Sequence, residues 1–567
     1  MSITRGRGRP YALHPLLASA PVPESKRDAA VEPGNAGDEL NAAERSRAAA
    51  DSLPEPLVLG EDDAPSSGSS VVRGGLWSLM ARGVPQIQVL AVSIAAARFL
   101  GPEGLGRQAF IAFTAVSAVR ILTGGLGPAL IRFIGEGRGQ RREDVVRGLI
   151  RWGWRIQLLG AVFGGGALLL PALFGSEPTG AWVLAAVAAA LAVMHSVPSS
   201  VLVALQRWRE ASIAGLVTGI VAVPATIAVL ALGGGITGMF AVEAAVALGN
   251  LAWTAWFARR AMGPAAVAVS PVLERRGEVL GFTGLTTVGV VLELVVWRRS
   301  ELFILERVAS DTQIALYAIS FAGLMALVRL AEAIPGVTMS TASAMAGAGE
   351  YEGIRSGYGR AMRLLFLGSL PLTATSLALG PEALRLVYGD AYGQAAPILL
   401  ILLFFLPLIP TVTVSYALLL ALGKVRVYLI VLAVAAVVDI GVALILIPPL
   451  GAIGAALANS AAQLAGAIPI VVYTARQVGS VTWEAGALVR AALASAGAGG
   501  LAWAGLNAIG GPVGLVVAAM VAGVAFAGLA VVLRIIPAGD ATWLADLGSR
   551  RLGPWFARAC RLAAARG

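Results

Sequence analysis

The residues best placed to do chemistry in this chain are charged side chains inside long apolar stretches. The segment VVWRRSELFIL, residues 295–305, is the densest case, with two arginines, a serine and a glutamate. A charged residue at the centre of a membrane helix costs about 2.5–3.5 kcal/mol on the insertion scale, whereas a Leu or Val returns only about 0.3–0.6 kcal/mol. The segment therefore predicts a polar cavity rather than a helix surrounded by lipid.

Similar charges recur in other apolar segments, mostly in the first two segments of two apolar blocks. Within a membrane, such residues usually face a bundle interior or a water-filled cavity. The residues expected to line a substrate cavity are Arg82, Gln86, Arg120, Trp297, Arg298 and Arg329. The acidic candidates for ion pairing, or for carrying a coupling proton or sodium ion, are Glu293, Glu301, Glu332 and Asp439. No catalytic residue is predicted.

Helix geometry groups the charges near residue 298. One helix is predicted over residues 280–305. At about 100° per residue, an arc of roughly 140° on that helix would hold four of the candidates. They are Glu293, Trp297, Arg298 and Glu301. The sequence thus predicts that one helix presents both charges and an aromatic ring to the cavity.

Each candidate also has an interpretation without a transport role. The i, i+3 spacing of Arg298 with Glu301, and of Arg329 with Glu332, fits local ion pairs that only hold helices together. Arg82 lies close enough to a helix end to reach water instead of a cavity. Asp439 equally fits a polar contact between helices. These alternatives stay open on the sequence alone.

Composition defines the class of protein in which these residues lie. The chain has 567 residues, of which 57% are hydrophobic and 13% charged, with a mean hydropathy of +0.78, which indicates an all-α polytopic membrane protein. One cysteine and two histidines cannot build a disulfide framework or a Cys/His metal site, so neither metal nor cofactor is expected. The net charge of +10 sits mainly in short loops, so it indicates topology rather than nucleic-acid binding.

Apolar windows of about 20 residues predict about fourteen membrane helices. The predicted divisions are a disordered cytoplasmic tail at 1–70, a six-helix lobe at 71–260, a cytoplasmic linker at 261–279, a second six-helix lobe at 280–476, two additional helices at 477–536 and a basic cytoplasmic tail at 537–567. Arginine and lysine concentrate in the loops after even-numbered spans, which predicts that both termini are cytoplasmic.

The two six-helix blocks resemble each other. ALQRWR at 204–209 is followed by a span and GITG at 235–238, and ALGKVR at 421–426 is followed by a span and GAIG at 451–454. This match favours two pseudo-symmetric lobes in the same orientation, a plan in which a central site is exposed alternately to each side. Chance similarity between two alanine-rich blocks is the alternative.

Several segments are similar to those of a known family. GLWSLMARGVPQIQVLAVSIAAARFLGPEGLG, WRRSELFILERV with YAISF, LVYGDAYGQAAPILLIL and LIPPLGAIGAALANSAAQL resemble bacterial polysaccharide-export flippases, including O-antigen flippases. These belong to the multidrug/oligosaccharidyl-lipid/polysaccharide exporter superfamily. The resemblance extends over residues 71–535 and contains no catalytic signature.

The resemblance implies a function for the cationic residues. Such flippases move undecaprenyl-diphosphate-linked sugars from the cytoplasmic to the outer leaflet of the bacterial inner membrane, for lipopolysaccharide or exopolysaccharide synthesis. It implies a cavity between the lobes, with the diphosphate bound by arginines in the helices of Arg82, Arg120, Arg298 and Arg329. The implied partners are the lipid-linked oligosaccharide, membrane lipids and polysaccharide polymerase or export proteins, without nucleic acid.

Three other functions remain to be distinguished. A cation-coupled multidrug antiporter of the same superfamily would prefer acidic residues in an apolar cavity, which the many arginines disfavour. A lipid II flippase shares the same chemistry. A membrane-embedded glycosyltransferase or polymerase would need a large outer domain, but the longest predicted outer loop, at 381–395, is short.

Overall fold

The computed structural model describes residues 68–140, 142–263, 276–297, 300–328, 338, 342, 345–346, 349–478, 484–552 and 554–564. In the first helix, side chains are described from Gln88 onward. Residues 74–567 form one compact unit. The predicted tail at 1–70 lies outside the described residues except for its last three positions.

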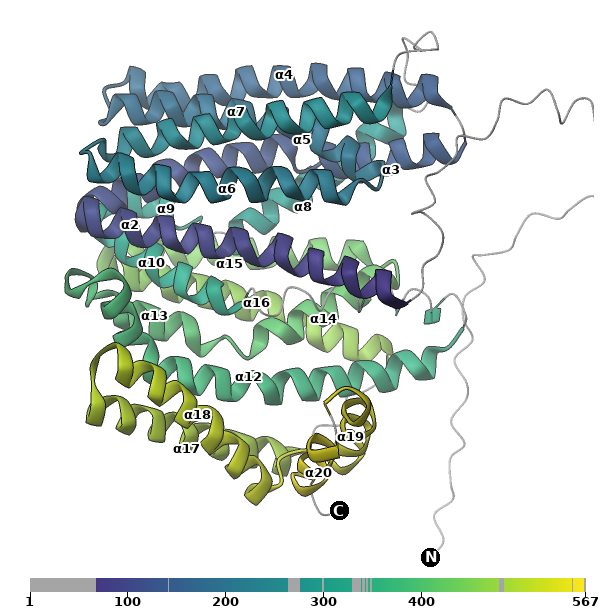
Figure 1. Cartoon of the computed structure of the whole chain (residues 1–567), viewed down its shortest axis with the longest axis vertical. Helices are drawn as coiled ribbons and strands as arrows, with labels where there is room; N and C mark the ends of the chain where they lie inside the picture. The colour runs from purple at the N-terminus through teal and green to yellow at the C-terminus, as the bar shows by residue number, and fades with distance from the viewer. Residues whose placement is uncertain are drawn as a thin grey trace, which may run out of the picture. The chain divides into compact units, whose positions relative to one another are not determined.

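The first helices form an N-terminal group, defined here as α2 to α7. Its members are α2 (Gly68–Thr123), α3 (Leu126–Gly139), α4 (Glu143–Leu173), α5 (Thr179–Ala204), α6 (Trp208–Ala231) and α7 (Gly235–Met262). Figure 1 shows α4, α5, α6 and α7 side by side, and each contacts at least one of the others. Within α2, Gly101 has φ 68° and ψ −179°, so two helical segments meet there at a kink.

The second set of helices, α8 to α16, is called the C-terminal group. It comprises α8 (Arg276–Trp297), α9 (Leu302–Val308), α10 (Asp311–Val328), α12 (Tyr351–Tyr388), η3 (Asp390–Tyr392), α13 (Ala395–Phe404), α14 (Leu408–Ala421), α15 (Val425–Leu450) and α16 (Ala452–Val478). Helices α15 and α16 form a closely packed pair, and α16 also contacts α10, α13 and α14. This group provides most of the cavity described below.

Two helical hairpins complete the chain. The first pairs α17 (Ala485–Ile509) with α18 (Gly511–Leu533), and the second pairs α19 (Ala538–Leu552) with α20 (Pro554–Leu562). Figure 1 shows α17 and α18 next to α12, which both contact. Asp540 at the start of α19 is buried and forms ion pairs with Arg360 and Arg363 of α12. The second hairpin is therefore held against α12 by ion pairs.

The prediction of an all-helical polytopic membrane protein is confirmed at this level. Twelve helices in the described part of the chain are long and apolar enough to cross a membrane, or 13 if the bent pair α13 and α14 counts as one span. The predicted total of about fourteen is higher for two reasons: the predicted spans at 75–99 and 108–134 overlap the single kinked stretch Gln88–Gly139, and the predicted span at 396–422 is the bent pair. The division into lobes at residues 260 and 280, and their duplication, stay predictions.

The predicted continuous helix over 280–305 is wrong. Helix α8 ends at Trp297, residues 300 and 301 are in a turn, and α9 begins at Leu302. The Ser300 hydroxyl lies 2.8 Å from the Val295 carbonyl oxygen, which would otherwise accept a helical hydrogen bond. A break allows the carboxylate of Glu301 to turn into the protein interior, where it is fully buried.

The apolar cores of the two helix groups are joined at one end of the molecule. The shared core contains Ala95–Ala97, Leu105 and Phe113 of α2 together with residues of α9, α10, α12 to α13, α15 and α16. At the opposite end, where most loop arginines lie, the cores are separate. One is formed by α3, α4, α5 and α7 with the start of α8, and another by α12 and α14 with Ala342. We call these ends the sealed end and the basic end.

Candidate functional site

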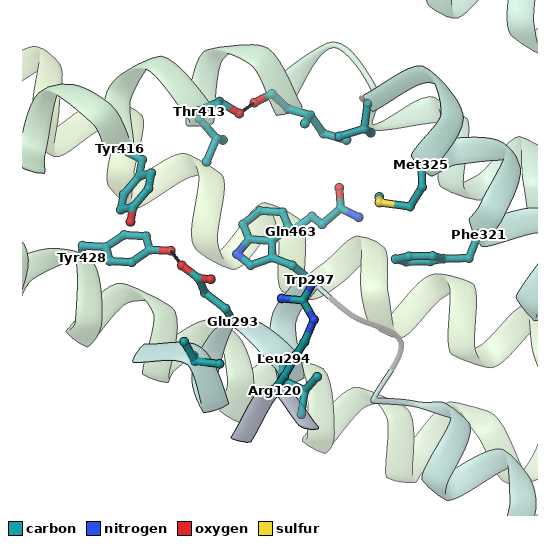
Figure 2. Close-up of a pocket in the computed structure, with 14 residues that line it drawn as sticks. Arg120, Glu293, Leu294, Trp297, Phe321, Met325, Thr413, Tyr416, Tyr428 and Gln463 are labelled. Atoms are coloured by element: carbon teal, nitrogen blue, oxygen red, sulfur yellow. Dashed lines mark hydrogen bonds between the residues drawn. The ribbon is translucent and has the colours of Figure 1, made fainter. Parts of the chain in front are cut away.

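A cavity of about 290 Å³ lies between α2 of the N-terminal group and the C-terminal group. Its side chains come from α2, α8, α10, α14, α15 and α16, and Figure 2 draws them as sticks. The residues are Arg120, Val290, Glu293, Leu294, Trp297, Phe321, Met325, Val328, Ile409, Val412, Thr413, Tyr416, Tyr428 and Gln463. A largely apolar cavity with a few convergent polar groups is typical of a ligand site.

Arg120 supplies positive charge to this cavity. It lies in the last turn of α2, where the partial negative charge at a helix C-terminus favours a cation. Just beyond it, Gly125 lies so close to Thr283 and Thr287 of α8 that a β-carbon would collide with them. This close approach holds the end of α2 against α8. Among the described residues, Arg120 is exposed and has no ion pair, so its guanidinium is available to a ligand.

Aromatic residues line a further part of the cavity. The rings of Tyr416 and Tyr428 lie 4.2 Å apart between centroids, at an angle of 35°, and Trp297 lies nearby in Figure 2. The Tyr428 hydroxyl donates a hydrogen bond of 3.0 Å to Oε1 of Glu293. We call Trp297, Tyr416 and Tyr428 the aromatic wall. Glu293 joins this wall and is the acidic residue in the described lining.

A polar chain leads from the cavity into the C-terminal group. Gln463 lines the cavity and donates a hydrogen bond of 2.6 Å to Oδ1 of Asn459. Asn459 in turn donates a hydrogen bond of 3.0 Å to Oε1 of Glu301. The Tyr317 hydroxyl also interacts with this carboxyl group. Amides on α16 therefore connect the cavity with a carboxyl group that is 0% exposed.

Asp439 of α15 completes this buried cluster. Its carboxyl group interacts with that of Glu301, and it is 1% exposed. Its Oδ2 lies 2.9 Å from the Ser300 hydroxyl, whose single hydrogen also has the Val295 carbonyl as an acceptor. Oδ1 of Asp439 and Oε2 of Glu301 have no hydrogen-bond donor in the described part of the chain. Two carboxyl groups thus face each other without a cation from the described residues.

The predicted residues are distributed over several environments. Arg120, Glu293 and Trp297 lie together in the cavity, whereas Glu301 and Asp439 lie behind it in the buried cluster. The side chains of Arg82 and Gln86, and the whole of Arg298, Arg329 and Glu332, lie outside the described residues.

Sequence reasoning did not identify five residues that the structure places beside the candidates. These are Tyr317, Tyr416, Tyr428, Asn459 and Gln463. The i, i+4 spacing of Asn459 and Gln463 in an apolar helix was a usable signal, because an amide buried among apolar residues needs hydrogen-bond partners. The tyrosines gave no comparable signal, since interior aromatic residues are common in any helical bundle.

Hydrogen bonds and an ion pair cross between the two helix groups at the sealed end. Arg107 forms a 2.6 Å ion pair with Glu306 of the other group, and its guanidinium is also held within its own group by a hydrogen bond of 2.8 Å to the Glu177 carbonyl. Arg98 donates hydrogen bonds to the carbonyl groups at the end of α12, the shortest being 2.6 Å to Leu386. The Tyr392 hydroxyl donates a 3.0 Å hydrogen bond to the Ala97 carbonyl. Together with the shared core, these contacts close the structure at this end.

The sequence matches a known family over more than half of the chain. Residues 95–397 match the family described as polysaccharide biosynthesis protein. No curated protein matches the chain.

The fold is similar to solved transporter structures. The lipid II flippase MurJ in an inward closed conformation superposes with a TM-score of 0.66 at 13% identity, over 81% of this chain and 98% of that one. An inward-facing multidrug resistance MATE family transporter of the MOP superfamily gives 0.60 at 17% identity, over 72% and 98%. A MOP superfamily transporter from Pyrococcus furiosus gives 0.54 at 18% identity, over 72% and 95%. At these identities the similarity concerns the fold.

Proposed function

Because this chain belongs to the polysaccharide biosynthesis protein family, we propose that it is a flippase for undecaprenyl-diphosphate-linked oligosaccharides. In this proposal it moves them from the cytoplasmic to the outer leaflet of the bacterial inner membrane, for polysaccharide synthesis. The observation that carries the proposal is Arg120, an arginine without an ion pair among the described residues, exposed in a cavity between two helix groups. Guanidinium groups bind diphosphate oxygens through two parallel hydrogen bonds.

The physical problem solved by such a cavity is desolvation. A diphosphate and its sugar hydroxyls lose hydration in hydrocarbon at a high free-energy cost, whereas a polyprenyl tail is already soluble in lipid. A cavity between helix groups can hold the head group while the tail stays outside. Arg120 compensates the diphosphate charge, and Arg82, Arg298 and Arg329 remain predicted contributors to the same site.

Alternating access supplies the transport step. We assign the sealed end to the outer side and the basic end to the cytoplasm, as the loop arginines predict, with both termini cytoplasmic. The structure is then closed to the outside, and the two predicted lobes must separate at the shared core to release a head group there. The ion pair of Arg107 with Glu306 must break in that step.

The buried carboxyl cluster is the proposed coupling site. Glu301 and Asp439 interact, and one oxygen of each has no donor in the described residues, so a bound proton or sodium ion relieves their repulsion. A proton on Asp439 could be donated to Ser300, which would leave the Ser300 hydrogen for the Val295 carbonyl. The Gln463 and Asn459 amides connect this cluster to the cavity, so cation binding and cavity shape can influence each other.

Two alternatives have specific support. Glu293 beside an aromatic wall would suit a cationic drug, as in a cation-coupled multidrug antiporter, and the MurJ-like fold suits a lipid II flippase. Both share the cavity but differ in the head group that it must bind. Transport of a lipid-linked oligosaccharide that is not lipid II therefore separates the proposal from both.

The test measures flipping in proteoliposomes that contain the full-length protein and a fluorescently labelled undecaprenyl-diphosphate oligosaccharide. We expect Arg120→Ala to lower the initial rate by about tenfold or more, because one charge-assisted hydrogen-bonding group is worth about 1.5–3 kcal/mol. Arg120→Lys should recover part of the rate, since the charge remains but the two-point contact does not.

Arg259→Ala serves as the matched control, because Arg259 is an exposed arginine at the end of α7 that does not line the described cavity. It should flip at the wild-type rate. Equal rates for Arg120→Ala and Arg259→Ala, in samples with equal protein insertion, would overturn the diphosphate assignment. Efflux of a cationic dye without any lipid flipping would instead support the antiporter.

A further inference from the structure

The aromatic wall and Glu293 form a surface of the cavity that has no role in binding the diphosphate in the proposed function. We propose that this surface is a subsite for the first sugar of the lipid-linked oligosaccharide, and that it selects an uncharged or amino sugar over a uronic acid. This inference rests on the proposed function, because it concerns the sugar attached to the diphosphate bound near Arg120. It adds a selectivity that the family assignment does not provide.

The shape of the wall favours a sugar ring. Tyr416 and Tyr428 come from adjacent helices, α14 and α15, and their rings pack at 4.2 Å between centroids. Each ring thereby restricts the rotation of the other, and an ordered aromatic surface loses little conformational entropy on binding. The apolar C–H face of a pyranose packs on such surfaces, with its hydroxyl groups directed toward neighbouring polar atoms.

Glu293 provides those polar atoms. The Tyr428 hydroxyl occupies Oε1 of Glu293, which fixes the carboxylate orientation. Oε2 has no hydrogen bond from the described residues, so it can accept one from a sugar hydroxyl or from an ammonium group. Hydrogen bonds to a charged acceptor are about twice as strong as neutral ones. A sugar with donor groups therefore gains both stacking and a strong hydrogen bond.

The same carboxylate discriminates against acidic sugars. In the described lining, Glu293 is the acidic residue, and Arg120 comes from a different helix group. Figure 2 shows Glu293 beside Tyr428, with Arg120 directed toward Trp297. If the diphosphate occupies Arg120, a uronic carboxylate on the next sugar would meet Glu293 without a compensating cation from the described lining. Two like charges at close range repel, most strongly where water is scarce.

The size of the cavity limits the subsite to the sugar nearest the diphosphate. About 290 Å³ is at the lower end of ligand pockets, which have volumes of about 300–1,000 Å³. A complete repeat unit of several sugars does not fit in addition to a diphosphate. Selection at this site therefore concerns the proximal sugar, while the rest of the repeat extends beyond the aromatic wall.

The test uses the full-length protein in lipid nanodiscs and native mass spectrometry to measure binding of three probes. These are undecaprenyl diphosphate alone, the same lipid with one N-acetylhexosamine, and the same lipid with one hexuronic acid. For the wild type, we expect the N-acetylhexosamine lipid to bind about tenfold more tightly than the hexuronic acid lipid, equivalent to about 1.4 kcal/mol. The sugar-free lipid should bind between them or close to the acidic probe.

Variants then separate the wall from the diphosphate site. Glu293→Gln keeps the shape of the side chain and should reduce the tenfold preference to near one by improving binding of the acidic probe. Tyr416→Leu should weaken the N-acetylhexosamine lipid and leave the sugar-free lipid bound as in the wild type. Tyr416→Phe, which retains the ring, should lose less of the preference than Tyr416→Leu.

The outcomes distinguish this inference from the proposed function. If all three probes bind equally and Arg120→Ala weakens all of them, the diphosphate site stands and the sugar subsite is overturned. If none of the probes binds the wild type, the proposed function is overturned, and the sugar subsite that rests on it is overturned as well. If Glu293→Gln retains the full preference, Glu293 is not the selecting group and the inference is overturned.

Discussion

The sealed end and the basic end differ in how the two helix groups meet. At the sealed end one apolar core includes residues of both groups, and arginines of α2 bond to α9 and to the end of α12. At the basic end the cores are separate, and among the described residues the start of α8 is the part of the C-terminal group that packs into the core of the N-terminal group. The contacts that hold the two helix groups together are therefore concentrated at the sealed end. A change to the outward-open state must break these contacts and form new contacts between the groups at the basic end.

Helix α8 shows what connects the two ends. Its first turns pack on α3, where Phe282 lies 6.1 Å from Phe133 between ring centroids. Its last turns pack on α15 and α16 and contribute Glu293 and Trp297 to the cavity. A movement between the two groups at the basic end must therefore displace α8. The cavity lining changes with it, which couples the site to the conformational state.

The largest effect on closure of the sealed end is expected when an aromatic ring is removed from the shared core. Phe113 is buried there, with its ring centroid 5.2 Å from that of Phe303 in the other group. Phe→Ala changes in well-packed cores cost about 3–5 kcal/mol. For Phe113→Ala, the contacts to the other group are lost only in the closed state, so opening of the sealed end should become easier. We expect outer-side labelling of a cysteine introduced at Thr413, in a Cys560→Ser background, to rise at least tenfold.

Phe240→Ala provides the control, because Phe240 is equally buried in a core that belongs to the N-terminal group alone. It should lower the melting temperature without changing outer-side labelling. If both variants alter labelling to the same extent, the shared core does not hold the sealed end closed.

The next test removes the ion pair at the sealed end. Arg107 and Glu306 are about one-fifth exposed, with side-chain exposures of 19% and 22%, and their atoms are 2.6 Å apart. Charge-assisted hydrogen bonds are worth about 1.5–3 kcal/mol when they are partly shielded from water. Arg107→Ala should raise outer-side labelling at the same Thr413 cysteine by several-fold, less than Phe113→Ala does.

Arg132→Ala is its counterpart at the basic end. The Arg132 and Glu278 atoms are 3.5 Å apart and their side chains are 44% and 41% exposed, so the pair is worth only about 0–1 kcal/mol. Outer-side labelling should therefore stay near the wild-type level. A larger increase for Arg132→Ala than for Arg107→Ala would contradict the assignment of closure to the sealed end.

The sequence predicted the class of fold because apolar length is a strong signal in membrane proteins. It also drew attention to Arg120 and Glu293, since the cost of burying charge marks such residues without any structure, and to Trp297, because it shares a helix face with Glu293. The turn at residues 300 and 301, before α9, was not predicted, because hydropathy alone does not show where a carboxylate finds hydrogen-bond donors. Glu301 finds them on α16, a helix more than 150 residues later in the chain.

The aromatic wall was the part least accessible from the sequence. Tyr416 and Tyr428 carry no charge, and their spacing across the turn between α14 and α15 follows no helical period. Their role in the cavity depends on the tertiary arrangement that brings Tyr428 into contact with Glu293. Uncharged site residues of this kind can therefore be recognised only once the fold is known, whereas buried charged residues can be identified from the free-energy cost of inserting them into a membrane.

The smallest effect on outer-side labelling is expected at the second C-terminal hairpin, α19 and α20, which lies at the basic end and is attached to α12 through the ion pairs of Asp540. Asp540 is 2% exposed and is bound by Arg363 at 2.7 Å and by Arg360 at 3.3 Å. Cys560 of α20 is buried in the same hairpin, and burial raises the pKa of its thiol, which lowers the reactive thiolate fraction at neutral pH. Asp540→Asn should loosen the hairpin and increase the labelling rate of Cys560 by about tenfold, equivalent to about 1.4 kcal/mol.

Cys560 is the single cysteine of the chain, so no other thiol contributes to the labelling signal. A matched control is Asp546→Asn, which changes an exposed carboxylate in the same helix. Outer-side labelling of the cavity should be unchanged by Asp540→Asn, because the hairpin is attached to α12 at the basic end and none of its described side chains belongs to the shared core. If Asp540→Asn instead opens the sealed end, the two ends are coupled through α12, and closure cannot be assigned to one end alone.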